Sequence, residues 1–206
     1  MRLHRLLLTA VSGMLSFDLL AGEFLQPCSE GVWGYEERVE TLIDTATETS
    51  RGEALSLSRW PSFASESGVR LDNSNQVHAV HFEKSLWAEG RRSLGALDFS
   101  SAQVPVRHSQ APIAPELAER IRRTFNQAIL SSRRSERFGL DGVSYAFTLP
   151  DAGCASAWSP EPESRSGQLV HLMKLLDAHA NAPDPAESEG RIAALLDVLE
   201  DADSAP

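Results

Sequence analysis

The feature that most constrains the fold is a change of hydrophobic period along the chain. From residue 54 to about residue 106, apolar and polar residues alternate in short runs, which is typical of strands with one buried face. From Leu117 to Ile129, apolar residues recur every three or four positions instead, which predicts an amphipathic helix. We therefore expect an α+β fold that begins with an antiparallel meander of about three or four strands.

Six segments are predicted as strands because they are extended in pattern and bounded by turn residues. They cover residues 55–60, 67–71, 76–83, 95–106, 143–148 and 154–158. Residues 72–75 read Asp-Asn-Ser-Asn, and short polar side chains of this kind satisfy local backbone groups and tolerate a positive φ. Residues 139–142 read Gly-Leu-Asp-Gly and predict a second tight turn.

Four helices are predicted, over residues 36–46, from Pro115 onward, after Ser164, and over residues 191–201. Pro115 suits a first helical turn, and the Ser164 hydroxyl can cap the helix that follows. We therefore expect a small antiparallel sheet packed against two or three amphipathic helices, with helical segments at the N- and C-terminal ends. Residues 181–190 are rich in Pro, Asp, Glu and Ser and predict a linker.

The acidic charge lies at the two ends of the chain. The 206 residues carry a net charge of −10, but residues 23–53 and residues 181–206 each carry −6, whereas residues 54–180 carry +1. This predicts an α+β domain over residues 54–180 between two acidic segments, and deletion of residues 184–206 is expected to leave the core folded. The net charge also argues against general nucleic-acid binding, which needs a basic footprint.

Residues 1–22 look like a secretory signal peptide, because Arg2, His4 and Arg5 precede a mostly apolar run. Asp18 interrupts that run, and no small-x-small cleavage site follows it, so an amphipathic first helix is the alternative. The run is also too short for a stable membrane span, which needs about 20 apolar residues. We expect a periplasmic or exported protein, with a cytoplasmic location as the alternative.

The state expected for the two cysteines depends on whether the protein is exported. In an exported protein, Cys28 and Cys154 are candidates for a single disulfide, whereas in the cytosol they would be two unrelated buried thiols. Their spacing in the sequence does not decide between the two.

A run of basic side chains gives the strongest local signal for a binding surface. Residues 120–137 sum to +5 in a chain of −10. The candidate partner-binding residues are Arg120, Arg123, Arg133, Arg134 and Arg137. An acidic partner could contact them, but they could equally pair with the acidic ends of the same chain or form a solvated helix face.

The sequence gives weaker evidence for other candidate sites. His78 and His81 point to opposite faces of a strand and do not form a metal pair, so neither a metal nor a cofactor is expected. Asp141 could be a catalytic carboxylate in its turn, although a turn residue is the simpler interpretation. Trp60, Trp87 and Trp158 could line a ligand site, although large aromatic residues more often belong to the core.

The middle of the chain resembles a family of small, uncharacterised bacterial α+β proteins that often have signal-like starts. The resemblance rests on Leu57-Ser58-Arg59-Trp60-Pro61-Ser62-Phe63, on Gly139-Leu140-Asp141-Gly142-Val143-Ser144-Tyr145, on Trp158-Ser159-Pro160 and on the leucine-rich helix that follows. It covers about residues 55–180. The resemblance implies a small α+β domain and carries no assigned activity.

These observations favour a non-enzymatic binding protein, exported and of the inhibitor or immunity type, whose acidic end contacts a basic protein partner. An enzyme with a site assembled around Asp141 and a histidine is one alternative. A structural protein of the envelope is the other.

Overall fold

The computed structural model describes residues 24–29, 34–90, 99–100, 102–134, 139, 141–182 and 184–204. The expectations for residues 1–22 lie outside the described residues. The strands are β1 (Gln26–Pro27), β2 (Leu55–Pro61), β3 (Ser67–Leu71), β4 (Gln76–Phe82), β5 (Val106–Pro112), β6 (Val143–Leu149) and β7 (Gly153–Trp158). The helices are α1 (Tyr35–Thr47), α2 (Leu86–Gly90), α3 (Pro115–Leu130), α4 (Arg165–Ala180) and α5 (Pro185–Ser204).

All seven strands form one antiparallel sheet in the order β1-β7-β6-β2-β3-β4-β5. Strands β2 to β5 are consecutive neighbours and form a meander, and the β6–β7 hairpin adds to the free side of β2. The predicted α+β fold with an antiparallel meander and packed helices is confirmed, although the sheet is larger than three or four strands.

Two elements differ from the expected positions by several residues. Of the strand predicted over residues 95–106, residues 95–98 and 101 lie outside the described residues, and among the others only Val106 is in a strand, because β5 runs from Val106 to Pro112. This edge strand carries His108 on one face and Arg107 on the other, so it has no hydrophobic period to recognise. Helix α5 begins at Pro185, inside the expected linker, since the Asp184 carboxylate accepts a hydrogen bond from the first turn and proline suits that position.

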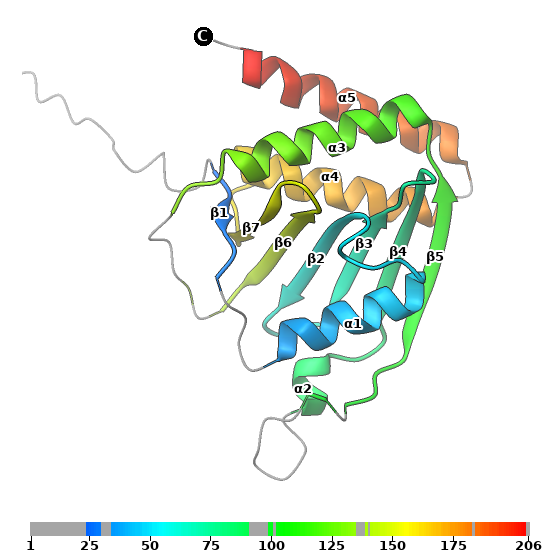
Figure 1. Cartoon of the computed structure of the whole chain (residues 1–206), viewed down its shortest axis with the longest axis vertical. Helices are drawn as coiled ribbons and strands as arrows, with labels where there is room; N and C mark the ends of the chain where they lie inside the picture. Colours follow the sequence, from blue (N-terminus) through cyan, green and yellow to red (C-terminus); the bar gives the residue numbers. More distant parts are fainter. Residues whose placement is uncertain are drawn as a thin grey trace, which may run out of the picture.

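Helices cover the two faces of the sheet unequally (Figure 1). Helix α1 packs on β3, β4 and β5 on one face. On the other face, α4 packs on β3, β4 and β5, and α3 packs on β6 and β7. Helix α5 lies outside α3 and α4 and contacts both of them.

The main core lies between the sheet and the helices α3, α4 and α5. Three residues of α5, namely Ile192, Leu196 and Leu199, are fully buried in it. A second core forms under α1, where Val39 and Ile43 are fully buried against β4. Both acidic end segments therefore contribute apolar residues to the folded domain, and this packing argues against the expectation that residues 184–206 are dispensable for folding.

Two of the elements that carried the family resemblance, residues 139–145 and 158–160, pack against each other. A Cβ atom at Gly139 or Gly142 would overlap the indole ring of Trp158, so glycine permits the close approach. The Ser159 Oγ accepts a hydrogen bond from the Val143 N–H at 2.9 Å. The turn before β6 is thus fixed to the end of β7, which places Trp158 at the surface of the sheet.

Cys28 and Cys154 form a disulfide in this structure, with their Cα atoms 5.5 Å apart. The bond fastens the segment after the short strand β1 to the start of β7, where the Cys28 N–H also donates to the Cys154 carbonyl oxygen. A two-residue strand has little pairing energy of its own, so the disulfide is a principal link between this edge and the rest of the sheet.

Candidate binding groove

The α1 side of the sheet carries an open groove over β6 and β7, where α1 does not extend. Its volume is about 940 Å³, which lies in the range of small-molecule and peptide sites. We call it the acidic groove. It is lined by Gln26, Cys28, Ser29, Gly34, Glu36, Glu37, Glu40, Thr41, Asp44, Arg51, Trp60, Gly139, Ser144, Ala146, Cys154, Ser156, Ala157 and Trp158.

The floor of the groove is polar and made of small side chains. Strand periodicity brings Ser144 and Ala146 of β6 and Ser156 of β7 to the same face, because residues two apart point the same way. Trp60 and Trp158 also line it, so two of the three tryptophans that sequence analysis singled out are at this site. The third, Trp87, packs edge-on against Tyr35 in the second core.

One wall of the groove is the acidic face of α1. Glu36, Glu40 and Asp44 lie four residues apart and therefore share one side of the helix, with Glu37 beside them. The apolar stripe of Val39 and Ile43 faces the sheet instead. The acidic N-terminal segment thus presents its carboxylates to the groove while its apolar side anchors the helix.

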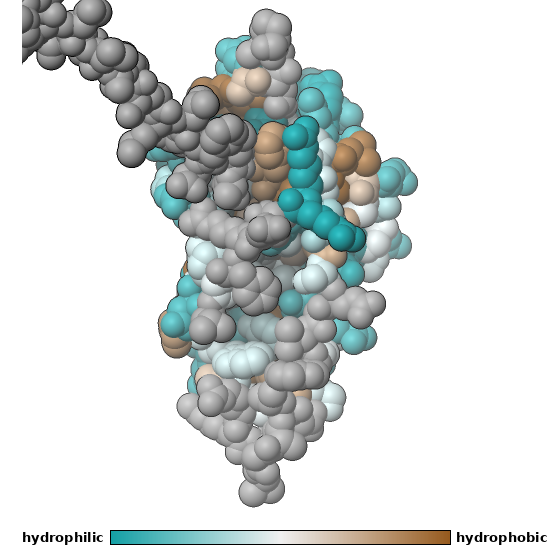
Figure 2. Space-filling view, turned by 90° about the vertical axis from the view of Figure 1, so that its left-hand side faces the viewer, coloured by the Kyte–Doolittle hydropathy of each residue, from teal (hydrophilic) through white to brown (hydrophobic). Residues whose placement is uncertain are grey.

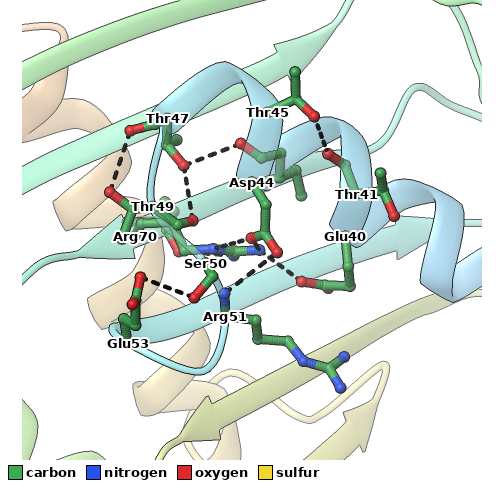
Figure 3. Close-up of polar contacts among 12 residues, drawn as sticks. Glu40, Thr41, Asp44, Thr45, Thr47, Thr49, Ser50, Arg51, Glu53 and Arg70 are labelled. Atoms are coloured by element: carbon green, nitrogen blue, oxygen red, sulfur yellow. Dashed lines mark hydrogen bonds and ion pairs between the residues drawn. The ribbon is translucent and has the colours of Figure 1, made fainter.

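Two of these carboxylates are held by a buried arginine (Figure 3). Arg70 of β3 is fully buried, and its Nη2 lies 2.6 Å from Glu40 Oε2 and 3.0 Å from Asp44 Oδ1. The Asp44 carboxylate also accepts a hydrogen bond from the Arg51 backbone N–H at 3.3 Å. These bonds fix the positions of Glu40 and Asp44 along the wall.

Negative charge remains in excess at this wall. Four carboxylates face two guanidinium groups, those of Arg70 and Arg51. Burial raises the pKa of Glu36, the neighbouring charge of Glu40 raises it further, and Arg51 lowers it. A nearby positive charge stabilises the ionised form of a carboxyl group whose pKa is raised in this way. The groove therefore favours a positively charged ligand.

The predicted partner-binding arginines that the structure describes differ in their contacts. Arg120 binds α5, with Nη2 2.7 Å from Asp197 Oδ1 and 2.7 Å from Glu200 Oε2, and Arg123 lies 4.0 Å from Glu200. This corresponds to the alternative in which the basic helix pairs with the chain's own acidic end. Arg120 and Arg123 therefore help to hold α5 against α3.

The remaining arginines lie elsewhere. Arg133 stacks over the ring of Phe24 at 4.5 Å from its centroid and donates its backbone N–H to the Leu25 carbonyl oxygen. Arg134 is exposed, and Arg137 lies outside the described residues.

On the side of the molecule that carries β1, hydrophilic residues lie beside small, separate hydrophobic patches (Figure 2).

The alternative enzymatic site is not assembled around Asp141. Its side chain is exposed in the turn before β6, and none of the described histidines forms a hydrogen bond or ion pair with it. Within the described residues, no three histidine, cysteine or carboxylate side chains gather closely enough to hold a metal ion. No helix in that part of the chain combines the length and the apolar character that a membrane crossing requires.

Sequence reasoning missed the groove, although one of its signals was visible. The acids at positions 36, 40 and 44 follow helical spacing on the polar side of a predicted helix. The pairing of β7 with β1, the disulfide edge and the burial of Arg70 depend on contacts between distant segments. No pattern within any one segment reports those contacts.

We compared the chain with protein-family models, curated proteins and solved structures, and none of the three comparisons found a match. The resemblance to a family of small bacterial α+β proteins therefore stays a prediction. The function has to be inferred from the geometry and charge of the groove.

Proposed function

We propose that this chain is a non-enzymatic bacterial binding protein that acts outside the cytoplasm and holds a basic segment of a partner protein in the acidic groove. The observation that carries the proposal is the row of Glu36, Glu37, Glu40 and Asp44 along one wall of an open groove. Glu37 is exposed and Glu36 is half-buried, so lysine or arginine side chains of an extended segment would reach these two carboxylates, and charge attraction would steer the encounter.

The two tryptophans support the same kind of ligand. Trp60 and Trp158 line the groove together with the carboxylates, and the apolar stems of lysine and arginine side chains pack favourably on such apolar surface. The serines of the floor can exchange hydrogen bonds with a peptide backbone. A basic segment with an extended backbone would use all three features of the groove.

Two features are consistent with export. Residues 2–21 form a basic and then apolar segment of the signal-peptide type, and Cys28 and Cys154 form a disulfide beside the groove. An exported protein that covers the basic surface of another protein would act as an inhibitor or as an immunity protein.

Fluorescence anisotropy with a labelled lysine- and arginine-rich peptide tests the proposal. We expect the purified protein to bind this peptide and not a glutamate-rich peptide of equal length, with an affinity that falls as salt rises. Exchange of Glu36 and Glu37 for glutamine should weaken binding about tenfold or more, since each removes a partner of a charge-assisted contact.

Glu119→Gln is the matched control, because Glu119 is an exposed carboxylate on α3, outside the groove. It should leave binding unchanged. Equal losses in Glu119→Gln and in the groove variants would show that only the overall acidity of the protein attracts the peptide, and would contradict the proposal.

A further inference from the structure

A second cavity lies on the other face of the sheet, between the strands and α4, and its volume is about 290 Å³. Its polar lining residues include Arg59, His81, Arg107, Tyr145, Lys174 and Asp177, together with Ser65, Glu66 and Ser67. We call it the basic pocket. It is separate from the acidic groove, since neighbouring residues of a strand point to opposite faces and Arg59 therefore points away from Trp60.

The strand register gathers the basic groups into one row. Tyr145 of β6 pairs with Arg59 of β2, Arg59 pairs with Ser67 of β3, Ser67 pairs with His81 of β4, and His81 pairs with Arg107 of β5. All five side chains therefore share one face at one level of the sheet. Basic side chains brought together in this way repel each other, so the row costs stability unless negative charge offsets it.

The carboxylates at the pocket offset only part of this charge. Asp177 of α4 is engaged with His81, whose Nε2 lies 2.7 Å from Asp177 Oδ1. Glu66 also lines the pocket, but its carboxylate accepts hydrogen bonds from Tyr35 Oη at 2.6 Å and from the Leu86 N–H at 2.9 Å. Both carboxylates thus have partners already.

The arginine and lysine side chains keep donors free. Arg59 uses one N–H to donate to the Ser65 carbonyl oxygen at 3.1 Å, which leaves the other guanidinium donors. Among the described residues, no carboxylate lies within ion-pair distance of Arg59, Arg107 or Lys174. The charges of Arg107 and Arg59 both lower the pKa of His81, although Asp177 raises it overall, so the three basic groups interact.

We propose that the basic pocket binds the oxyanion group, a phosphate or a carboxylate, of a small ligand. Arg59 inside the pocket would make the bidentate contact that guanidinium groups form with such anions. Arg107 and Lys174 are exposed and would close around the anion from the rim. The volume of about 290 Å³ suits a small molecule and excludes a folded partner.

The test is an NMR titration of the ¹⁵N-labelled protein with inorganic phosphate, with sodium chloride added to keep the ionic strength constant. We expect saturable amide shifts around Arg59, His81 and Lys174. A parallel titration with acetate separates the two anion classes, since tighter phosphate binding assigns a phosphate-bearing ligand and tighter acetate binding a carboxylate.

Arg107→Gln and Lys174→Gln should each weaken the binding by at least about threefold, as expected for exposed charged contacts. Both side chains are exposed, so these variants test the pocket even if Arg59→Gln does not fold. Arg123→Gln on α3 is the control and should bind as the unchanged protein does. Equal affinity in all of these proteins, shifts spread over other basic residues, or no shift at all would each overturn the proposal.

Discussion

Arg70 Nη2 lies 2.6 Å from Glu40 Oε2 at a point where the arginine is fully buried beneath α1. Because Asp44 Oδ1 is 3.0 Å from the same nitrogen, one guanidinium group holds two carboxylates at the wall of the acidic groove. This relationship ties the charge of the groove to the stability of the fold.

Exchange of Arg70 for methionine should destabilise the protein by about 3–5 kcal/mol, because it leaves Glu40 and Asp44 next to each other without their buried counter-charge. Urea unfolding measures the loss. Arg51→Met is the matched control, since the Arg51 side chain is exposed, and it should change stability by less than about 1 kcal/mol. Similar midpoints for the two variants would show that the buried contact is not stabilising.

The His81–Asp177 pair should give stability a specific pH dependence. Asp177 raises the pKa of His81 in the folded protein, whereas an unfolded histidine titrates near about 6.5. Between the unfolded and the folded pKa of His81, the folded state binds more protons than the unfolded state. The contribution of the pair to the free energy of unfolding is therefore fully present below about pH 6.5 and is lost as pH rises through the folded pKa.

Asp177→Asn should remove this part of the pH profile, which thermal unfolding between about pH 5 and 9 would follow. Burial and the nearby His78 lower the pKa of His108, so that group gives the opposite slope, but both proteins retain it. The difference between the two profiles therefore reports His81. A constant difference across the whole range would mean that the pair does not titrate as described.

Helix α5 should be required for a stable fold. Leu196→Ala removes a fully buried side chain from the main core and is expected to cost about 2–5 kcal/mol. Val198→Ala on the same helix is the control, because Val198 is 51% exposed, and its effect should stay below about 1 kcal/mol. If the two variants unfolded at the same urea concentration, α5 would not be part of the core in solution.

Removal of the disulfide should loosen the β1 edge. The double exchange of Cys28 and Cys154 for serine is expected to cost about 2–5 kcal/mol, since the bond joins positions 126 residues apart in sequence. Urea unfolding of this variant, and of the unchanged protein with and without reducing agent, measures the effect. An unchanged midpoint on reduction would show that the two thiols are not joined in the purified protein.

The elements with a clear hydrophobic period were predictable from the sequence. The pattern of residues 67–71 gives the bounds of β3, and the Ser164 side chain accepts a hydrogen bond from the Gly167 N–H at the start of α4, as its type predicts. The edge strand β5 was misplaced because it is polar on both faces. The start of α5 was misplaced because Pro185 reads as a linker residue until its position in the first turn is known.

The site was less predictable than the fold. The acids of α1 were visible in the sequence as charge. Their buried partner Arg70 was not, because it lies in a strand between the apolar residues Val69 and Leu71. The arginine cluster suggested a binding surface, yet Arg120 is committed to α5. In both cases, the pairing of charges between segments far apart in sequence decides which charges stay available to a ligand.

The measurement that tests the acidic groove most directly is the pKa of the Glu36 side chain with and without a basic peptide, followed by ¹³C NMR of its carboxyl group. Burial and Glu40 raise this pKa in the free protein. A lysine or arginine side chain bound in the groove should lower it, because an adjacent positive charge stabilises the carboxylate. A pKa that stays the same at saturating peptide would contradict the account, since the peptide would then bind elsewhere.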